Sequence, residues 1–234
     1  MPKVTVFEAR CRNADVVMEA ATKIERLSIP GPEGDLEALL EWNPEWTLRQ
    51  LAVVCHPHPL YGGSMHNKVV FRAAKAAIHL EIPTLRFNFR GVGHSEGEYA
   101  KGIGERDDAR AALDYLTERF PQVPVSLMGF SFGSVVALAV GSADPRVNCL
   151  VGIGLPANSA DFGFLQNVRK PKLVVQGTQD QFGSQENVEK VFRSLKEPKR
   201  LRFVPEADHF LTGKLHDLQL EIQDFLQGVV NPLQ

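Results

Sequence analysis

The stretch SLMGFSFGSVVALAV, Ser126–Val140, joins a short apolar run to a longer one through a serine that has a glycine two residues away on either side. The first run has the length of a buried strand and the second that of a helix. A sharp turn between them would push the Ser131 side chain outward and strain its backbone, and Gly129 and Gly133 would permit the close approach of the flanking segments. The pattern therefore predicts a nucleophile elbow. The alternative is a loop serine or a helix N-cap serine.

Strand-like runs alternate with helical patterns from about residue 51 onward. The expected strands are LAVVCH, PTLRFNF, VPVSLMG, NCLVGIGL, KLVVQGT and RLRFVPEA, and the expected helices are NKVVFRAAKAAIHL, GERDDARAALDYLTERF, FGSVVALAVG, QENVEKVFRSLK and KLHDLQLEIQDFL. Nearly continuous apolar strands indicate a parallel sheet covered on both faces. Upstream, KIERLSIPGPEGDLEALLEW predicts an antiparallel hairpin. We therefore expect one α/β domain with a doubly wound, mostly parallel sheet and helices on both faces.

The composition excludes several functional classes. The net charge of −2 argues against nucleic acid as a partner, and no apolar run approaches the length that spans a membrane. The N-terminal residues lack the apolar core of a signal peptide. Three cysteines, Cys11, Cys55 and Cys149, have neither metal-binding nor disulfide spacing. We therefore expect a cytoplasmic protein, a monomer or homodimer, whose cysteines are reduced.

A serine nucleophile needs a histidine base, and the base needs an orienting carboxylate; after an elbow the chain order is serine, acid, histidine. Two histidines follow Ser131. His209 comes directly after the last expected strand, whereas His216 falls within the final helical pattern. Asp180 follows the strand KLVVQGT, where ligands bind in such sheets. Asp208 adjoins His209 and Asp144 lies in an expected turn, so the sequence favours Ser131, Asp180 and His209.

With these residues in place, the sequence resembles the alpha/beta-hydrolase superfamily, and in particular the small lidless serine hydrolases related to dienelactone hydrolase. The segments that carry the resemblance are CHPHPLYGGSMHNKVV, RFNFRGVGHSEGEY, GFSFGS, GTQDQF and ADHFL. It covers about residues 24–228 as the core of a single domain 1–234, with residues 1–22 as an N-terminal extension. It implies an eight-stranded sheet, Ser131, Asp180 and His209 as a triad, and acyl hydrolysis without a cofactor. Dienelactone hydrolase itself has a cysteine nucleophile, so its substrate is not implied.

Acyl transfer also needs backbone donors for the oxyanion. One should be the N–H of Phe132, the residue after the nucleophile. Relatives often carry His-Gly in the loop that supplies the second, but this chain has His56-Pro57-His58-Pro59. The two prolines lack an N–H, so we expect the donor to be Leu60 or Tyr61.

Two other motifs in the sequence have alternative interpretations. His56-x-His58 is also the start of a metal-binding pattern, but leucine and tyrosine stand where an aspartate and a histidine would follow. RGVGHSEGE contains two glycines of a nucleotide-binding pattern but lacks the third glycine and the helix. We therefore expect no metal and no cofactor.

The span between the sixth core strand and the strand of Asp180 is about 15 residues, too short for a large cap domain. An open pocket should favour short acyl chains. Aromatic side chains near strand ends are candidates for its lining: Phe130, Phe162, Phe164, Phe182 and Phe210. The sequence thus predicts a carboxylesterase or thioesterase that acts on small acyl substrates. The alternatives are a non-catalytic protein of this fold that binds a ligand or partner, and a perhydrolase-type side activity.

Overall fold

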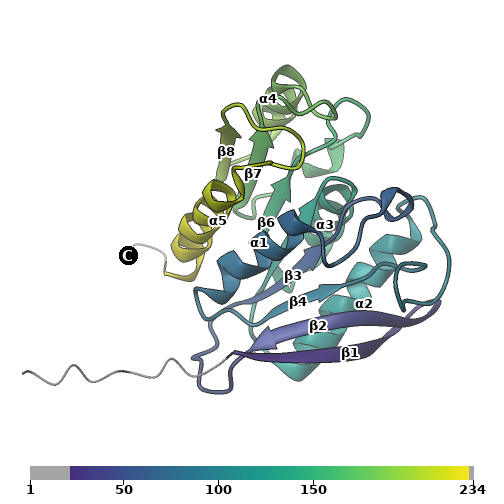
Figure 1. Cartoon of the computed structure of the whole chain (residues 1–234). Coiled ribbons are helices and arrows are strands. Elements are labelled where there is room, and N and C mark those ends of the chain that lie inside the picture. Colours follow the sequence, from purple (N-terminus) through teal and green to yellow (C-terminus); the bar gives the residue numbers. More distant parts are fainter. Residues whose placement is uncertain (1–21, 232–234) are drawn as a thin grey trace, which may run out of the picture.

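The computed structural model describes residues 22–231 (Figure 1). The expected extension, residues 1–22, therefore lies outside the described residues except for its last position. The strands are β1 Lys23–Gly31, β2 Gly34–Trp42, β3 Leu51–Cys55, β4 Thr84–Phe87, β5 Val125–Phe130, β6 Val147–Ile153, β7 Lys172–Gly177 and β8 Lys199–Val204. The helices are α1 Lys68–Ile78, α2 Gly104–Arg119, α3 Phe132–Ala143, α4 Gln185–Ser194 and α5 Leu215–Val230, with short 3₁₀ turns η1 Pro59–Tyr61 and η2 Gly163–Leu165.

The strands within the described residues form one eight-stranded sheet in the order β1-β2-β4-β3-β5-β6-β7-β8. β2 is antiparallel to both β1 and β4, and every other neighbouring pair is parallel. The predicted hairpin and the predicted mostly parallel sheet are both confirmed. Because β3 and β5 lie side by side in the middle of the sheet, the carboxyl end of β5 lies midway along the row of strand ends.

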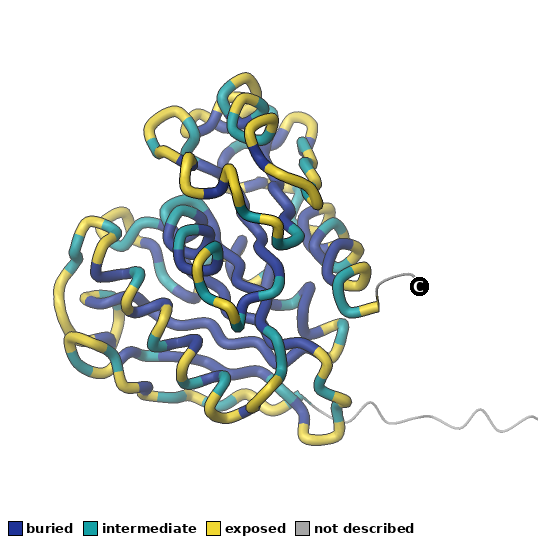
Figure 2. The backbone as a smooth tube through the Cα atoms, turned by 180° about the vertical axis from the view of Figure 1, so that it is seen from behind, coloured by how far each residue is buried: buried dark blue, intermediate teal, exposed yellow. Residues whose placement is uncertain are grey.

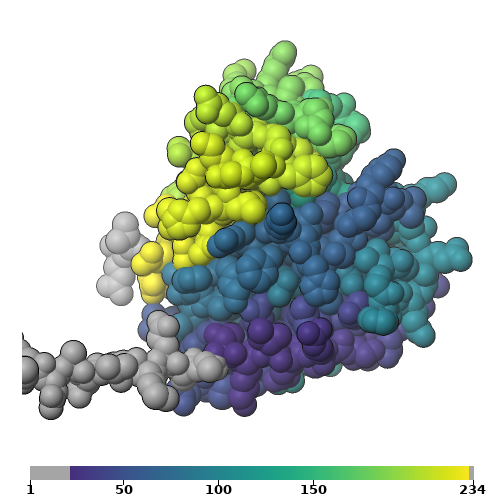
Figure 3. Space-filling model, in the orientation of Figure 1, coloured from purple at the N-terminus to yellow at the C-terminus, as the bar shows by residue number. Residues whose placement is uncertain are grey.

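Two layers of helices cover the sheet. Helices α1 and α5 pack against each other on one face, where Figure 3 shows α5 in yellow beside α1 in blue. Helices α2, α3 and α4 contribute to the core on the other face. Strands β3, β4 and β5 are buried along their whole length, as the dark interior of Figure 2 shows. The runs of β3 and β5 are nearly continuously apolar because both of their faces are covered, whereas β4 also carries the buried polar residues Thr84 and Arg86.

The connection from β6 to β7 contains only the short turn η2 and no inserted domain. The absence of a large cap, expected from the length of this segment, is thus seen in the structure of residues 154–171. Cys55 and Cys149 are buried, unpaired core residues, and Cys11 lies outside the described residues. None of the helices found between residues 22 and 231 has the length and apolar character needed to cross a membrane.

Candidate active site

Ser131 lies at the turn from β5 into α3 with φ 55° and ψ −121°, a left-handed conformation that residues with a side chain rarely adopt. A Cβ atom at Gly129 would come within 2.1 Å of the carbonyl oxygen of Gly133. A Cβ at Gly133 would come within 2.3 Å of the carbonyl oxygen of His56, which follows β3. Both glycines are therefore required sterically, one by the turn itself and one by the neighbouring strand end. The predicted strain and close approach are present.

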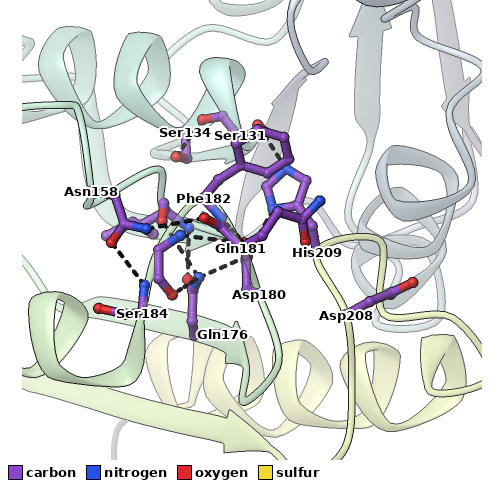
Figure 4. A network of polar contacts seen from close by, with 12 residues as sticks. Ser131, Ser134, Asn158, Gln176, Asp180, Gln181, Phe182, Ser184, Asp208 and His209 are labelled. Atoms are coloured by element: carbon purple, nitrogen blue, oxygen red, sulfur yellow. Dashed lines mark hydrogen bonds and ion pairs between the residues drawn. The ribbon is translucent and has the colours of Figure 1, made fainter.

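The structure brings Ser131, His209 and Asp180 together, although they come from three separate loops (Figure 4). The Oγ of Ser131 lies 2.9 Å from Nε2 of His209, and Nδ1 of His209 lies 2.7 Å from Oδ2 of Asp180. Since an ionised carboxylate only accepts, Nδ1 carries the proton and donates it to Asp180. Nε2 is then free to accept from the serine hydroxyl. His209 and Asp180 are both buried, and Ser131 is partly exposed.

Asp180 is fixed by further donors that the sequence analysis did not identify. Its Oδ1 accepts the backbone N–H groups of Phe182 (2.8 Å) and Gly183 (3.3 Å). Its Oδ2 also accepts from Nε2 of Gln176, at 2.8 Å. The Oε1 of Gln176 accepts the backbone N–H of Leu155, so this side chain ties the acid to the end of β6. The signal that could have identified Gln176 is a polar residue near the carboxyl end of the buried strand KLVVQG, whose other polar residue, Lys172, stands at its start.

The rejected candidates lie elsewhere. Asp208 accepts the backbone N–H and the hydroxyl of Thr212, and in Figure 4 its side chain lies apart from the His209–Asp180 pair. Asp144 is paired with Arg146 at 2.7 Å, which lowers the pKa of its carboxyl. His216 is an exposed residue in the first turn of α5. The two aspartates are thus engaged in local contacts and His216 faces solvent, whereas Ser131, His209 and Asp180 form one hydrogen-bonded chain.

Comparison with known proteins identifies the family. The model of a family described as alpha/beta hydrolase domain matches residues 53–231. The chain belongs to the alpha/beta hydrolase family. It is 36% identical to the uncharacterized protein RP471 of Rickettsia prowazekii over 207 residues, which cover 84% of this chain and 86% of that protein.

Two solved structures are similar over most of their length. One is a serine hydrolase without lid from Xanthomonas campestris, with 35% identity and a TM-score of 0.82 over 92% of this chain and 98% of that one. The other is an alpha-beta serine hydrolase homologue from Coxiella burnetii, with 36% identity and a TM-score of 0.81 over 86% of this chain and 97% of that one. The expected membership of the lidless alpha/beta serine hydrolases is therefore confirmed.

The loop after β3 in this alpha/beta hydrolase is arranged differently from what the sequence suggests. The N–H of Leu60 donates to Nδ1 of His58 at 3.2 Å, and the N–H of Tyr61 donates to the carbonyl of His58 at 3.1 Å. Both N–H groups therefore already have an acceptor within the turn η1. The N–H groups of His58 and Phe132, by contrast, have no acceptor within residues 22–231. The sequence analysis looked for the donor after Pro59, because Pro57 and Pro59 lack an N–H. It therefore did not consider the N–H of His58, which lies between the two prolines.

Both ring nitrogens of His56 and His58 are engaged in holding this loop. Nε2 of His56 accepts the N–H of Phe89 at 3.0 Å, so its Nδ1 carries the proton and donates to the carbonyl of Pro57. Burial lowers the pKa of His56 to about 4. Nδ1 of His58 accepts from Leu60, and its Nε2 contacts the hydroxyl of Tyr99 at 3.1 Å. In the described part of the chain, no cluster of His, Cys, Asp and Glu is arranged to hold a metal ion.

The motif RGVGHSEGE forms a turn in which Gly91, Gly93 and Gly97 have positive φ. The turn is fixed to the antiparallel hairpin, since the N–H of His94 donates to Glu37 and the N–H of Glu96 donates to the carbonyl of Asp35. Its glycines therefore allow the backbone conformation of the turn, as expected of a structural turn.

A cavity of about 680 Å³ opens beside Ser131. Its lining includes His58, Phe132 and His209, together with side chains from the loop before α2 and from the β6–β7 connection. Of the aromatic candidates, Phe182 and Phe210 line it, and both are about half exposed. Phe130 is buried and packs on the ring of His209, while Phe162 and Phe164 do not line the cavity.

Proposed function

We propose that this protein is a serine hydrolase that cleaves small carboxylic esters or thioesters, as carboxylesterases do. The observation that carries the proposal is the continuous hydrogen-bonded chain from Ser131 through His209 to Asp180, with distances of 2.9 and 2.7 Å. The serine opens onto a cavity, so an acyl group can reach it. The Xanthomonas campestris and Coxiella burnetii relatives are described as serine hydrolases, which supports the same reaction here.

In the first half of the reaction, Oγ of Ser131 attacks the acyl carbon while its proton passes to Nε2 of His209. The C–O or C–S bond of the tetrahedral intermediate then breaks, and the proton on Nε2 goes to the leaving alcohol or thiol. The products of this half are the free alcohol or thiol and an ester of Ser131. The carboxylate of Asp180 accepts four hydrogen bonds, which hold it in place beside Nδ1 of His209.

In the second half, a water molecule gives its proton to Nε2 of His209 as its oxygen attacks the acyl carbon of that ester. The bond between the acyl carbon and Oγ of Ser131 then breaks, and Oγ takes the proton back from Nε2. The carboxylic acid leaves and the serine is restored. The reaction uses one water per acyl group and changes no oxidation state.

We assign the oxyanion donors to the backbone N–H groups of Phe132 and His58. Both residues line the cavity beside Ser131, and neither N–H has an acceptor within residues 22–231. The Phe132 N–H belongs to the first turn of α3, whose dipole adds a partial positive charge at the same point. A preorganised pair of donors of this kind contributes about 3 kcal/mol per donor to transition-state stabilisation.

Ser131→Ala tests the proposal. We expect hydrolysis of 4-nitrophenyl acetate to fall by about 10⁴-fold or more, because the other residues cannot form the acyl-enzyme. Labelling of the protein by a fluorophosphonate probe should disappear as well.

The matched control is Ser142→Ala, which removes another hydroxyl from α3 that donates only to the carbonyl of Ala139. This variant should keep both the hydrolysis of 4-nitrophenyl acetate and the labelling by the fluorophosphonate probe. If the Ser131→Ala variant hydrolyses the ester at the wild-type rate, the assignment of the nucleophile is wrong. If the wild-type protein neither hydrolyses esters nor takes the label, the alternative of a non-catalytic binding protein is favoured.

A further inference from the structure

Arg106, in the first turn of α2, lines the cavity that contains Ser131. Its Nε atom is buried and has no hydrogen-bond partner, and its guanidinium forms no ion pair within residues 22–231. Arg90 and Arg86 are each held by a buried carboxylate, from Asp108 and Glu41 respectively. The Nε of Arg86 is also buried and unpartnered, but its two Nη atoms donate to Glu41 and to the carbonyl of Met65. Arg106 differs because no part of its guanidinium has a partner within residues 22–231. A buried guanidinium donor without an acceptor is costly, and such groups are normally paired. The missing partner of Arg106 is therefore expected to come from outside residues 22–231.

A second cation lies beside the same cavity. Lys101 is exposed, lines the cavity and has no salt bridge within the described residues. No aspartate or glutamate is among the residues that line the cavity. Glu105, which lies between Lys101 and Arg106 in the chain, is buried, and its two carboxylate oxygens accept the backbone N–H groups of Ala100 and Gly102. The charged side chains that line the cavity, Lys101 and Arg106, are therefore both positive.

The loop that carries Lys101 and leads into α2, where Arg106 lies, is held in place next to the nucleophile. Glu105 clamps it through the two hydrogen bonds to Ala100 and Gly102, of 2.8 and 2.7 Å. A Cβ at Gly102 would lie 3.4 Å from the ring of Phe132, so the loop packs against the residue that follows Ser131. A cation held on the same cavity as the nucleophile can bind one end of a substrate while the ester group at the other end reaches Ser131.

We propose that Arg106, assisted by Lys101, binds a carboxylate on the substrate, so that the preferred esters or thioesters carry a negative charge a few bonds from the bond that is cleaved. This inference rests on the proposed hydrolase function and adds the class of substrate. The carboxylate can belong to the acyl group, as in a half-ester of a dicarboxylic acid, or to the leaving group. Arg106 touches a group of the substrate that does not react, so its contribution is to binding rather than to the chemical step.

The test uses two pairs of substrates that differ in charge. Mono-4-nitrophenyl adipate and 4-nitrophenyl hexanoate place a carboxylate or a methyl group at the end of the acyl chain. 4-Acetoxybenzoate and its methyl ester place the charge on the leaving group or remove it. In the wild-type protein, we expect kcat/KM to be about 10- to 100-fold higher for the charged member of one pair, mainly through KM. The pair that shows the preference identifies the side on which the carboxylate binds.

Arg106→Gln should abolish this preference, because it should lower kcat/KM for the charged ester far more than for the neutral ester of the same pair. Lys101→Gln should reduce it by a smaller factor, because Lys101 is exposed to solvent. The matched control is Arg110→Gln, one turn further along α2, where the arginine is exposed and paired with Asp107. It removes the same charge and should keep the preference. The proposal is overturned if the wild type favours neither charged substrate, or if Arg106→Gln slows charged and neutral esters equally.

A binding measurement separates this proposal from the hydrolase reaction. The Ser131→Ala variant cannot form the acyl-enzyme, so the binding of monomethyl adipate and of 4-acetoxybenzoate to it can be followed by calorimetry. One of the two should bind, and binding should be lost in Ser131→Ala/Arg106→Gln but kept in Ser131→Ala/Arg110→Gln. If wild type hydrolyses no ester but this pattern is seen, the proposed reaction fails and the anion site stands. Absence of binding to Ser131→Ala overturns the anion site even if neutral esters are hydrolysed.

Discussion

Gln176 is a buried residue of β7 whose amide contacts the acid of the proposed triad on one side and the backbone after β6 on the other. Its Nε2 donates to Asp180, and its Oε1 accepts from the N–H of Leu155. The orientation of the Asp180 carboxylate therefore depends on a side chain that touches neither the serine nor the histidine. Gln176 is a positioning residue for the acid.

Replacing Gln176 by Met tests this role. Loss of the donor should turn the Asp180 carboxylate and lower kcat for ester hydrolysis by about 10-fold or more, since one charge-assisted hydrogen bond is removed. The N–H of Leu155 is also left without its acceptor, so the free energy of unfolding should fall by about 1–3 kcal/mol. Steady-state kinetics and chemical denaturation measure the two effects.

The control is Gln219→Met, which changes another buried glutamine that accepts from Arg72 on α1. It should lower stability without lowering kcat. Equal loss of kcat in both variants would mean that Gln176 acts through stability alone.

At the scale of single residues, the sequence was informative where chemistry restricts the choice. Ser131, Asp180 and His209 were predictable because residue type, chain order and strand-end placement all limit the candidates. The role of Gln176 was not predictable, because it depends on a contact with a loop 21 residues away along the chain. The lack of a partner for Arg106 within residues 22–231 was not predictable either, since pairing is a property of the folded structure.

At the scale of elements, the segment between β3 and α1 shows how a loop can be fixed without regular structure. His56 and His58 each use both ring nitrogens for contacts that hold it, and Asn67 closes it by capping α1 through the N–H of Val69. The turn η1 was not predicted, and it is this turn that engages the N–H groups of Leu60 and Tyr61.

Because burial lowers the pKa of His56 to about 4, its titration should appear in the pH dependence of stability. The neutral form is favoured in the folded protein, whereas in the unfolded chain a histidine has a pKa of about 6.5. The stabilisation is therefore complete above about pH 6.5 and is lost as the pH falls toward 4. We expect a loss of about 3 kcal/mol over this window.

Chemical denaturation at a series of pH values measures this effect, with His56→Asn as the comparison because it removes the titrating group. The variant should be less stable at pH 7 and should show a shallower dependence on pH between 6.5 and 4. The same slope in both proteins would exclude His56 as its source.

Most elements themselves were predicted correctly, because buried parallel strands and amphipathic helices leave strong patterns. The differences lie at the ends: β5 extends to Phe130, and α5 continues to Val230. Element ends depend on which backbone groups find partners, and the N–H of Ser131, just beyond β5, donates to the carbonyl of Ile153. Such a partner cannot be read from the local sequence.

At the scale of the whole molecule, the β6–β7 connection is short, and no domain formed within residues 22–231 covers the cavity beside Ser131. Its rim is formed by partly exposed aromatic residues, Phe182 and Phe210 among them. An acyl chain longer than the cavity must extend into water.

We therefore expect kcat/KM to peak at short acyl chains, roughly two to six carbons. Each methylene that is buried contributes about 0.8 kcal/mol, or about fourfold in kcat/KM, and a solvated methylene contributes little. A series of 4-nitrophenyl esters from acetate to laurate, corrected for spontaneous hydrolysis, measures the dependence. A continued rise to twelve carbons would show that the chain is enclosed along its length.

The separation of the reacting residues along the chain also has a consequence in time. Ser131 and His209 are 78 residues apart in sequence. At about 5–20 residues per second, a ribosome completes the serine about 4 to 16 seconds before the histidine. During that interval the elbow between β5 and α3 can already exist, but its hydroxyl has no base. On the proposed function, a growing chain therefore carries a serine without its base, and hydrolysis begins only after β8 has been made and the loop that follows it has brought His209 against the elbow.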